Sequence, residues 1–177
     1  YINCKKKISS ILTTPQYETL HQTAYSNKKN MYYYIFEASS HSLDQDRIKS
    51  FPVNLAAITN ISQDHLDYHK NFREYKKAKF KLFTQKLDSQ GIAILNDKIN
   101  GIDLLKKRLI KNRIITYGTY RSNINLQNDR NKIKIKLYDK KYFLNNLILS
   151  QIELENISCA IACCIGLGLD IKKILKV

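Results

Sequence analysis

The chain has 177 residues, enough for one domain with a substantial core, and its net charge at pH 7 is +15. It contains no apolar run near the ~18 residues that span a membrane, and its start does not resemble a signal peptide, so we expect a cytoplasmic protein without membrane insertion. A nucleic-acid partner would account for the charge, but the lysines are spread along the chain and the aromatic residues lie mostly in apolar runs. This distribution favours a solvated basic surface, and no nucleic-acid partner is expected.

The first helix signal is the run Thr13-Thr14-Pro15. Thr14 fits an N-cap with Pro15 at the first helical position, and the helix would continue from Glu18 to Tyr25 and end in Asn27–Asn30. From the residues alone, a structural cap and a binding role both remain open for the two threonines.

Residues 31–36 are aromatic or aliphatic throughout and predict a buried strand that ends at Glu37. Two serines and a histidine, His41, follow Glu37, which is unusual for a purely structural turn. Taken alone, Glu37 is more simply interpreted as a capping or ion-pairing carboxylate. The histidine is interpreted as structural. Arg47 offers a planar fork suited to a carboxylate or phosphate, or alternatively a surface ion pair with Asp44 or Asp46.

The stretch 55–83 combines a strand, a polar loop and a helix. Leu55 to Ile58, after Pro52, is typical of a short buried strand, and ligands bind beyond the carboxyl ends of such strands in open α/β sheets. The loop that follows concentrates groups able to bind metal or transfer protons, namely Asn60, Ser62, Asp64, His65, Asp67 and His69. A helix with an inward face comes next, indicated by the helical spacing of Phe72, Tyr75, Lys79 and Leu82.

Strand and helix patterns then alternate. Gly91 to Leu95 and Ile114 to Tyr117 are short apolar strands, and Ile99 to Lys111 between them has the pattern of an amphipathic helix. Such alternation predicts an α/β fold with a mostly parallel, doubly wound sheet flanked by helices.

The region Asn123 to Ser150 changes character. Ile133, Ile135 and Leu137 alternate with lysines, a turn follows at Asp139-Lys140-Lys141, and Tyr142 to Leu149 returns, which predicts a small antiparallel accessory sheet. Leu154 to Leu167 is an apolar helix stopped by Gly166 and Gly168. Three of the four cysteines lie on this helix, where Cys behaves as a small hydrophobe.

Two motifs resemble a known family. TNISQDHLDYH followed by Tyr-x-x-Ala-Lys is similar to the central domain of the Mur ligases, the ATP-dependent amide-forming enzymes of peptidoglycan synthesis. EASSHSLDQDRI, Glu37 to Ile48, narrows the resemblance to the UDP-N-acetylmuramoyl-tripeptide synthetases, which add the third residue of the stem peptide. The resemblance implies that residues 1–177 are a central domain truncated at both ends. The phosphate loop, which the five glycines do not form, would lie upstream of residue 1, and a C-terminal domain would lie beyond Val177.

The resemblance also implies roles for individual residues. Glu37 would hold a first Mg²⁺ and His65 a second, while Lys79 would be a carbamate that orients the second ion, so these three are the expected catalytic and metal-binding residues. Asp64 could set the tautomer of His65. The UDP-muramoyl-dipeptide would be bound by Thr13, Thr14, Ser39, Gln45 and Arg47.

The nucleotide would be bound by Asn60 and Asn156. The family usually has a Gly-x-x-Asn-x-x-Asn run at the start of the last helix, with asparagines that reach the adenine. This chain keeps the second asparagine, Asn156, but has Ser150 in place of the glycine and Glu153 in place of the first asparagine. We therefore expect an altered adenine site.

Lys79 has two interpretations. On the inward face of a helix an unpaired ammonium is costly and tends to lose its proton, and the neutral amine can take up CO₂ to give an oxygen ligand that Mg²⁺ prefers. Without the resemblance, a lysine that extends its ammonium to water is the simpler interpretation. The resemblance favours the carbamate.

The implied activity is ligation through an acyl phosphate with ATP and Mg²⁺ as cofactors. The partners would be a UDP-N-acetylmuramoyl-dipeptide and an amino acid whose identity the sequence does not specify, and the protein would be a monomer. The segment alone is expected to be inactive. Two alternatives remain: another Mur ligase or a folylpolyglutamate synthetase-like ligase, and a non-catalytic basic module that binds nucleic acid.

Overall fold

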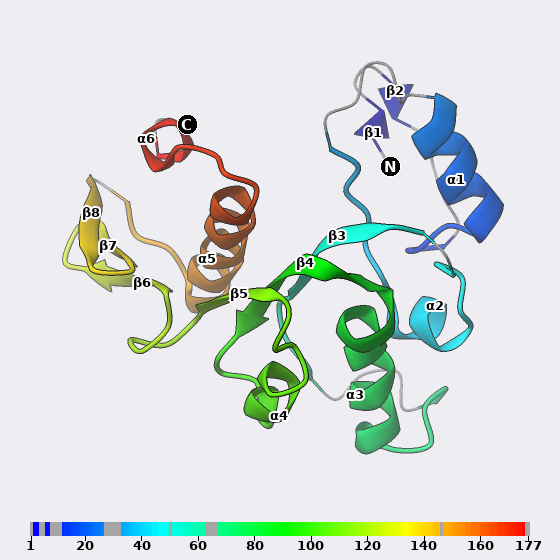
Figure 1. The fold of residues 1–177 in the computed structure, drawn as a ribbon. Helices are drawn as coiled ribbons and strands as arrows, with labels where there is room; N and C mark the ends of the chain where they lie inside the picture. Colours follow the sequence, from blue (N-terminus) through cyan, green and yellow to red (C-terminus); the bar gives the residue numbers. More distant parts are fainter. Residues whose placement is uncertain are drawn as a thin grey trace. The chain divides into compact units, whose positions relative to one another are not determined.

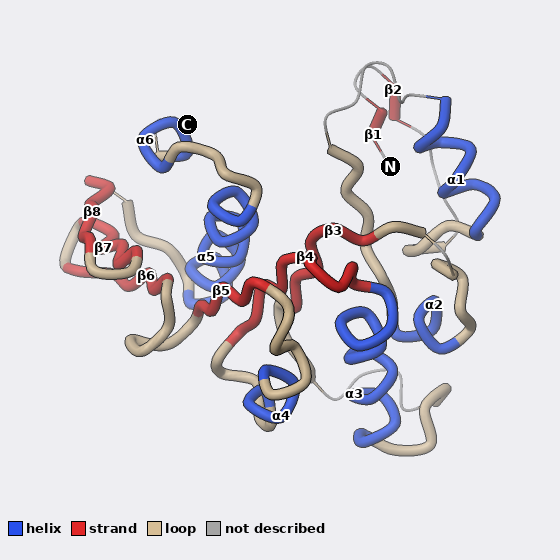
Figure 2. The backbone as a smooth tube through the Cα atoms, in the orientation of Figure 1, coloured by secondary structure: helices blue, strands red, loops and turns tan. Residues whose placement is uncertain are grey.

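The structure is a computed structural model that describes residues 2–3, 6–7, 12–26, 33–49, 51–62, 67–145 and 147–175. The chain forms two compact units, drawn in Figure 1 and Figure 2. The first comprises Tyr1–Pro52 and Gln63–Lys86, and the second comprises Val53–Ser62 and Leu87–Val177. Within the described ranges, no helix is long and apolar enough to cross a membrane.

The second unit is built on one six-stranded sheet in the order β3-β4-β5-β6-β7-β8. Neighbouring strands are parallel from β3 to β6 and antiparallel from β6 to β8, which confirms the predicted fold class. The strands are β3 (Val53–Ile58), β4 (Leu87–Asn96), β5 (Arg113–Tyr117), β6 (Ile124–Asp129), β7 (Lys132–Leu137) and β8 (Lys140–Asn145).

Helix α5 (Gln151–Gly166) packs on this sheet and forms the core of the second unit with it (Figure 1). The register pairs Ile94 of β4 with Ile115 of β5, and both side chains are completely buried. On β7, Ile133 and Ile135 are also completely buried, whereas the alternating lysines are not. The period-two pattern therefore assigns one face of the accessory strands to the core, as predicted.

The start of α5 differs from the prediction. The helix begins at Gln151, earlier than expected, because Ser150 is its N-cap in a capping box with Glu153. The helix ends at Gly166, and Gly168 follows in the left-handed conformation with φ 81°, so the predicted stop at these glycines is confirmed. A Cβ on Gly166 would lie 3.1 Å from Leu55 Cδ1, which indicates that the glycine permits close packing of the helix on β3. The chain continues into a short helix, α6 (Ile171–Ile174).

Three further predictions for this unit need correction. The helix expected over Ile99–Lys111 is only α4 (Ile102–Lys106), because Gly101 precedes it in the left-handed conformation with φ 76° and three-residue turns follow it. Strand β6 was not predicted as a separate strand. The hairpin turn lies at Tyr138 and Asp139, ahead of the predicted position, so β8 already begins at Lys140.

The first unit is mainly helical. Its elements are β1 (Ile2–Asn3), β2 (Lys6–Lys7), α1 (Tyr17–Ser26), α2 (Ser40–Asp44), α3 (Phe72–Lys81) and the π-helix η1 (Leu82–Lys86). The strands β1 and β2 pair antiparallel. Leu20, Leu43, Ile48 and Phe51 form a buried cluster, and Tyr34 and Phe36 pack against it.

Two predictions for the first unit are wrong. Residues 33–36 do not form a buried strand: they are extended and alternate in exposure, with Ile35 86 % exposed while Tyr34 and Phe36 contact the cluster. Among the described residues this segment has no strand partner. Helix α1 begins at Tyr17, so Pro15 is not its first residue and Thr14 is not its N-cap.

Candidate functional site

Thr14 joins the start of the first unit to the segment that precedes α2. Its Oγ1 donates a hydrogen bond to the carbonyl of Glu37 at 2.7 Å and accepts one from the amide of Ser39 at 2.9 Å. The Thr14 side chain is completely buried. The hydroxyl therefore fixes the backbone of the predicted substrate motif, and Thr13 beside it is exposed.

Ser39 is the N-cap of α2. Its Oγ accepts a hydrogen bond from the amide of Ser42 at 3.2 Å and lies 3.3 Å from Thr14 Oγ1. The hydroxyl of Ser42 in turn donates to the carbonyl of Ser39 at 2.8 Å. These contacts hold Ser39 in the turn that links Thr14 with α2.

Gln45 and Arg47 lie together on the turn after α2. Arg47 Nε donates to Gln45 Oε1 at 2.8 Å, and Arg47 Nη1 donates to the carbonyl of Thr14 at 3.3 Å. The carboxylates considered as ion-pair partners of Arg47 are instead paired with lysines: Asp44 with Lys81, and Asp46 with Lys86. The guanidinium has five N–H donors, so further donors remain for a carboxylate or phosphate.

The structure thus brings together four of the five predicted substrate-binding residues, Thr14, Ser39, Gln45 and Arg47. Tyr68 joins them, because Gln45 Nε2 donates to its hydroxyl at 3.3 Å. The Tyr68 hydroxyl itself donates to Asp44 Oδ2 at 3.3 Å. Sequence reasoning missed this tyrosine, although it lies within the DHLDYH motif.

The structure describes only two of the three predicted metal-binding residues, Glu37 and Lys79. Asp64 and His65 lie outside the described residues. The side chain of Glu37 is exposed, and among the residues that the structure describes no three His, Cys, Asp or Glu side chains are grouped as for a metal ion. Their metal-binding roles stay predictions.

Lys79 is half-buried on α3, and its Nζ lies 5.3 Å from the centroid of the Tyr75 ring. Tyr75 is buried, as expected for the inward face, but Phe72 is 38 % exposed and does not belong to it. A series of tilted and edge-on ring contacts continues from Tyr75 through His69 and Tyr68 to His41, with centroid distances of 5.5, 4.8 and 4.1 Å. The packing of His41 agrees with its interpretation as a structural histidine.

In the second unit, the predicted nucleotide-binding residues Asn60 and Asn156 are both exposed. The residues at which the chain departs from the family pattern form the cap of α5. Glu153 Oε2 accepts hydrogen bonds from Ser150 N at 2.8 Å and from Ser150 Oγ at 2.7 Å, and these bonds lower the pKa of the Glu153 carboxyl. Ser150 and Glu153, the residues that differ from the family pattern, therefore stabilise the start of α5 by forming a capping box.

A polar cluster that the sequence did not indicate lies at the carboxyl ends of β4 and β5. Asp97 pairs with Lys106 at 2.6 Å and accepts a hydrogen bond from Ser122 at 2.5 Å. Burial alone would lower the pKa of Lys106, but its bonds to Asp97 and Asp103 outweigh burial and raise it. This edge of the sheet is where ligands bind in open α/β folds.

Two buried side chains also hold the backbone at the carboxyl end of β3 by hydrogen bonds. Asn96 Nδ2 donates to the carbonyl of Thr59 at 2.7 Å, and the Tyr117 hydroxyl donates to the carbonyl of Ile58 at 2.9 Å. These bonds fix the backbone immediately before Asn60.

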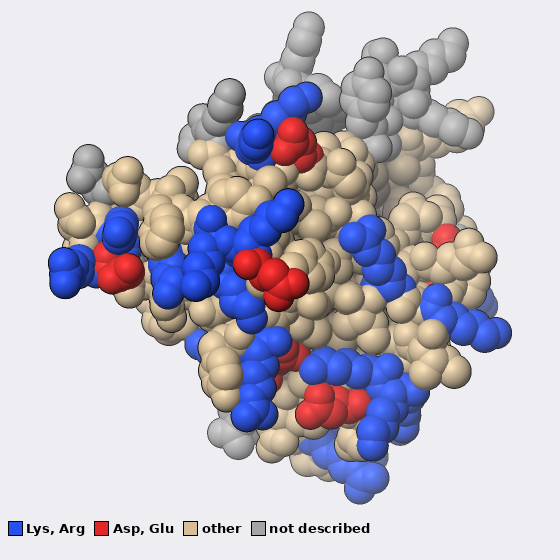
Figure 3. Space-filling view, turned by 60° about the vertical axis from the view of Figure 1, so that its left-hand side comes forward, with Lys and Arg blue, Asp and Glu red and all other residues tan. Residues whose placement is uncertain are grey.

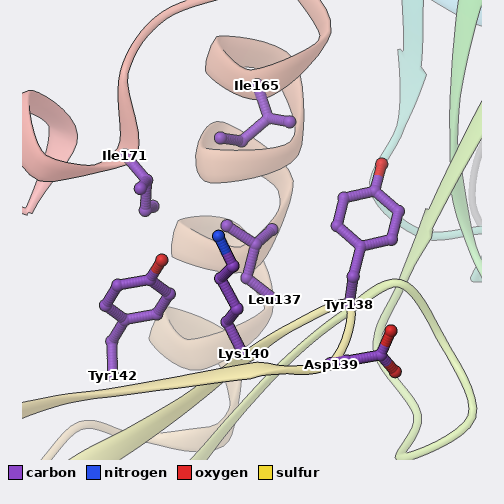
Figure 4. A pocket seen from close by; sticks show the side chains of 7 residues that line it. All are labelled: Leu137, Tyr138, Asp139, Lys140, Tyr142, Ile165 and Ile171. Atoms are coloured by element: carbon purple, nitrogen blue, oxygen red, sulfur yellow. The ribbon is translucent and has the colours of Figure 1, made fainter.

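A cavity of about 270 Å³ lies elsewhere in the second unit, between the hairpin turn and α5 (Figure 4). None of the predicted site residues lines it. Its lining residues are Leu137, Tyr138, Asp139, Lys140, Tyr142, Ile165 and Ile171.

On the face drawn in Figure 3, lysines and arginines are distributed over the surface with acidic residues between them. This distribution agrees with a solvated basic surface on that face.

The chain belongs to the Mur ligase family: residues 1–164 match the Mur ligase middle domain. It is 37% identical over 159 residues to the UDP-N-acetylmuramoyl-L-alanyl-D-glutamate–2,6-diaminopimelate ligase of Rickettsia rickettsii, covering 85% of this chain and 33% of that protein. The ligase of the same name from Aquifex aeolicus is 34% identical over 180 residues, covering 94% of this chain and 35% of that protein. The chain thus spans about a third of the length of these relatives.

Solved structures confirm the fold. A crystal structure of MurF from Acinetobacter baumannii has a TM-score of 0.61 at 17% identity, over 70% of this chain and 28% of that one. MurF from Thermotoga maritima, crystallised in complex with ADP, has a TM-score of 0.55 at 13% identity, over 75% and 31% of the two chains.

Proposed function

We propose that the chain is the central domain of an ATP-dependent ligase of peptidoglycan synthesis that joins 2,6-diaminopimelate to UDP-N-acetylmuramoyl-L-alanyl-D-glutamate in the cytoplasm. The observation that supports this most directly is the Glu37–Ile48 motif, in which Arg47 donates hydrogen bonds to Gln45 and to the carbonyl of Thr14. Diaminopimelate is proposed as the third amino acid because the Rickettsia and Aquifex relatives are diaminopimelate ligases.

The substrate site would be the polar cluster of the first unit. Arg47 and Gln45 would bind an anionic group of the muramoyl-peptide, since a guanidinium fork matches a carboxylate or phosphate. Thr13, being exposed, would contact the same substrate. Thr14 and Ser39 would act by holding the backbone of the motif, because their hydroxyls already make the bonds described above.

The reaction must turn a carboxylate oxygen into a leaving group. The substrate carboxylate would take the γ-phosphoryl group of ATP, whose bond to the β-phosphate oxygen breaks and releases ADP, and the amine of diaminopimelate would then attack the acyl carbon. The C–O bond to phosphate breaks, the amine loses a proton and inorganic phosphate leaves. The contribution of this chain would be to orient the dipeptide, which is the main task of the protein in phosphoryl transfer.

Magnesium would be held by Glu37, His65 and the carbamate form of Lys79. The described donors supply atoms suited to this chemistry: the Glu37 carboxylate is exposed and offers oxygen ligands, and the Lys79 side chain is half-buried, where its carbamate form would add a further oxygen ligand. When bound, the ion supplies charge neutralisation for the phosphates.

ATP would be contacted by Asn60 and by Asn156 on α5. Asn60 comes just after the end of β3, where the backbone is held by Asn96 and Tyr117. Because Glu153 is bound within the helix cap, Asn156 would be the residue of the family's asparagine pair that is left to reach the base.

A chimaeric ligase tests the proposal, with this chain replacing the matching region of the Rickettsia rickettsii relative. We expect phosphate release from ATP that depends on both the muramoyl-dipeptide and diaminopimelate, with L-lysine as the control amine. Arg47→Ala should raise KM for the dipeptide by about tenfold or more, since a charged hydrogen bond contributes about 1.5–3 kcal/mol. A folded chimaera that prefers another amino acid or another carboxylate substrate would contradict the assignment.

A further inference from the structure

The helix that contains Lys79 ends in an unusual way. Helix α3 stops at Lys81, and Leu82–Lys86 continues as a π-helix. On an α-helix, residues five apart lie about 140° apart around the axis. A π turn, with hydrogen bonds between residues five apart, brings them close to the same side. Lys81 and Lys86 can therefore point toward one common segment.

That segment is Asp44–Arg47, the last residue of α2 and the turn that follows it. Lys81 Nζ contacts Asp44 Oδ1 at 2.7 Å, and Lys86 Nζ contacts Asp46 Oδ1. The side chains of Lys81 and Lys86 are only 25% and 10% exposed, which is low for lysine. Two lysines from one continuous helix thus hold two carboxylates of one short turn.

The turn also has a conformation that needs support. Asp46 has φ 58°, in the left-handed region that residues other than glycine enter at a cost. The hydrogen bond from Lys81 lowers the pKa of Asp44, and the hydrogen bond from Lys86 lowers the pKa of Asp46. Both observations agree with carboxylates held as anions in a fixed geometry.

Gln45 and Arg47, which alternate with these aspartates along the chain, are the residues proposed to bind the substrate. Gln45 lies between Asp44 and Asp46 and accepts the hydrogen bond from Arg47 Nε. The side chains of Asp44 and Asp46 are bound to the lysines of α3 and η1, and these ion pairs hold the backbone of the turn. The side chains of Gln45 and Arg47 are not used in those ion pairs and hydrogen-bond to each other.

We propose that Lys81 and Lys86 are positioning residues that hold Gln45 and Arg47 ready for an anionic oxygen group of the substrate, and that the π-helix Leu82–Lys86 exists to align the two lysines. The identity of the ligand as a muramoyl-dipeptide rests on the proposed function. The alignment itself rests on the ion pairs, the low exposure of the lysines and the backbone of Asp46.

The first experiment uses this chain without any assay of ligation. Nuclear magnetic resonance follows the Arg47 Nε–H signal while L-alanyl-D-glutamate or UDP is added. We expect Lys86→Met to weaken binding by about tenfold, as loss of a charge-assisted contact would, and Lys86→Arg to restore most of it. Lys77→Met is the matched control, because Lys77 is exposed and makes only a 3.9 Å pair with Glu74.

The two probes separate the sources of the anion. A loss confined to the dipeptide assigns the site to a carboxylate, and a loss confined to UDP assigns it to the diphosphate. The proposal is overturned if the wild-type chain binds neither probe, or if Lys86→Met binds as tightly as wild type while its Asp46 carboxyl pKa has risen toward the ordinary value.

The chimaeric ligase provides the second measurement. Lys86→Met should raise KM for the muramoyl-dipeptide about tenfold while kcat and KM for ATP stay within about twofold, since a positioning residue acts on the binding of one substrate. A fall in kcat with an unchanged dipeptide KM would contradict the positioning role. An inactive wild-type chimaera would count against the proposed function, whereas the binding experiment on the chain would still decide the role of Lys86.

Discussion

Replacing Thr14 by valine should destabilise the first unit by about 2–3 kcal/mol, because the completely buried hydroxyl makes two hydrogen bonds that contribute about 1–1.5 kcal/mol each. Valine keeps the shape of threonine but leaves the carbonyl of Glu37 and the amide of Ser39 without this partner. The free energy of unfolding, measured in urea for the wild-type and variant chains, gives the difference.

Thr23→Val is the matched control. Its hydroxyl donates to the carbonyl of Thr19 within α1 at 2.7 Å and is exposed to solvent, so its loss should change stability by less than about 0.5 kcal/mol. If Thr14→Val were as neutral as this control, the role of Thr14 in fixing the motif backbone would be refuted. We expect Thr14→Val to shift the Ser39 amide resonance and to leave the helicity of α1 unchanged, since α1 begins three residues later at Tyr17.

Three further predictions concern packing, pH and the lysine modification. Gly166→Ala should lower stability by about 1–2 kcal/mol in urea unfolding, because the new methyl group would lie 3.1 Å from Leu55 Cδ1; an increase would mean that helix propensity prevails. Since the pKa of Asp46 is lowered in the folded chain, its stabilisation is present above about pH 4 and disappears as the pH falls through the folded value. The loss of stability between pH 6 and pH 3 should therefore be smaller in Lys86→Met, and an equal loss in both chains would contradict this. In the chimaeric ligase, Lys79→Arg should abolish most turnover, and ¹³C-bicarbonate should give a carbamate resonance on Lys79; near-normal turnover without that resonance would rule out the modification.

Much of the fold could be predicted because the signals are local. The apolar run at 55–58 and the helical spacing around Tyr75 each lie within one segment, and β3 and α3 appear there. The hairpin was also predictable, because lysines alternate with Ile133 and Ile135 on a strand with one buried face.

The errors arose where partners are distant or the backbone is unusual. The Thr14 hydroxyl has its partners 23 and 25 residues away, so the Thr-Pro pair alone suggested a helix cap. The helix expected from Ile99 is shortened by the left-handed Gly101, which an apolar pattern does not reveal.

The candidate site was found by motif, but its support was not. Gln45 and Arg47 were identified from the resemblance, whereas no role was predicted for Lys81 or Lys86. Their pairing with the turn depends on the π-helix, whose hydrogen bonds follow from tertiary contacts rather than from local propensity.

The interleaving of the two units has a consequence for synthesis on the ribosome. Strand β3 emerges before the residues 63–86 that complete the first unit, and its partner β4 emerges only after them. During that interval β3 is an apolar strand with no neighbour, which is a hazard for association between nascent chains. The first unit can form both ion pairs, Lys81–Asp44 and Lys86–Asp46, only after Lys86 has left the ribosome, and Lys86 lies one residue before β4 begins. A pause in translation after β3 has left the ribosome, but before Lys86 and β4 have done so, should therefore lower the yield of folded protein more than a later pause.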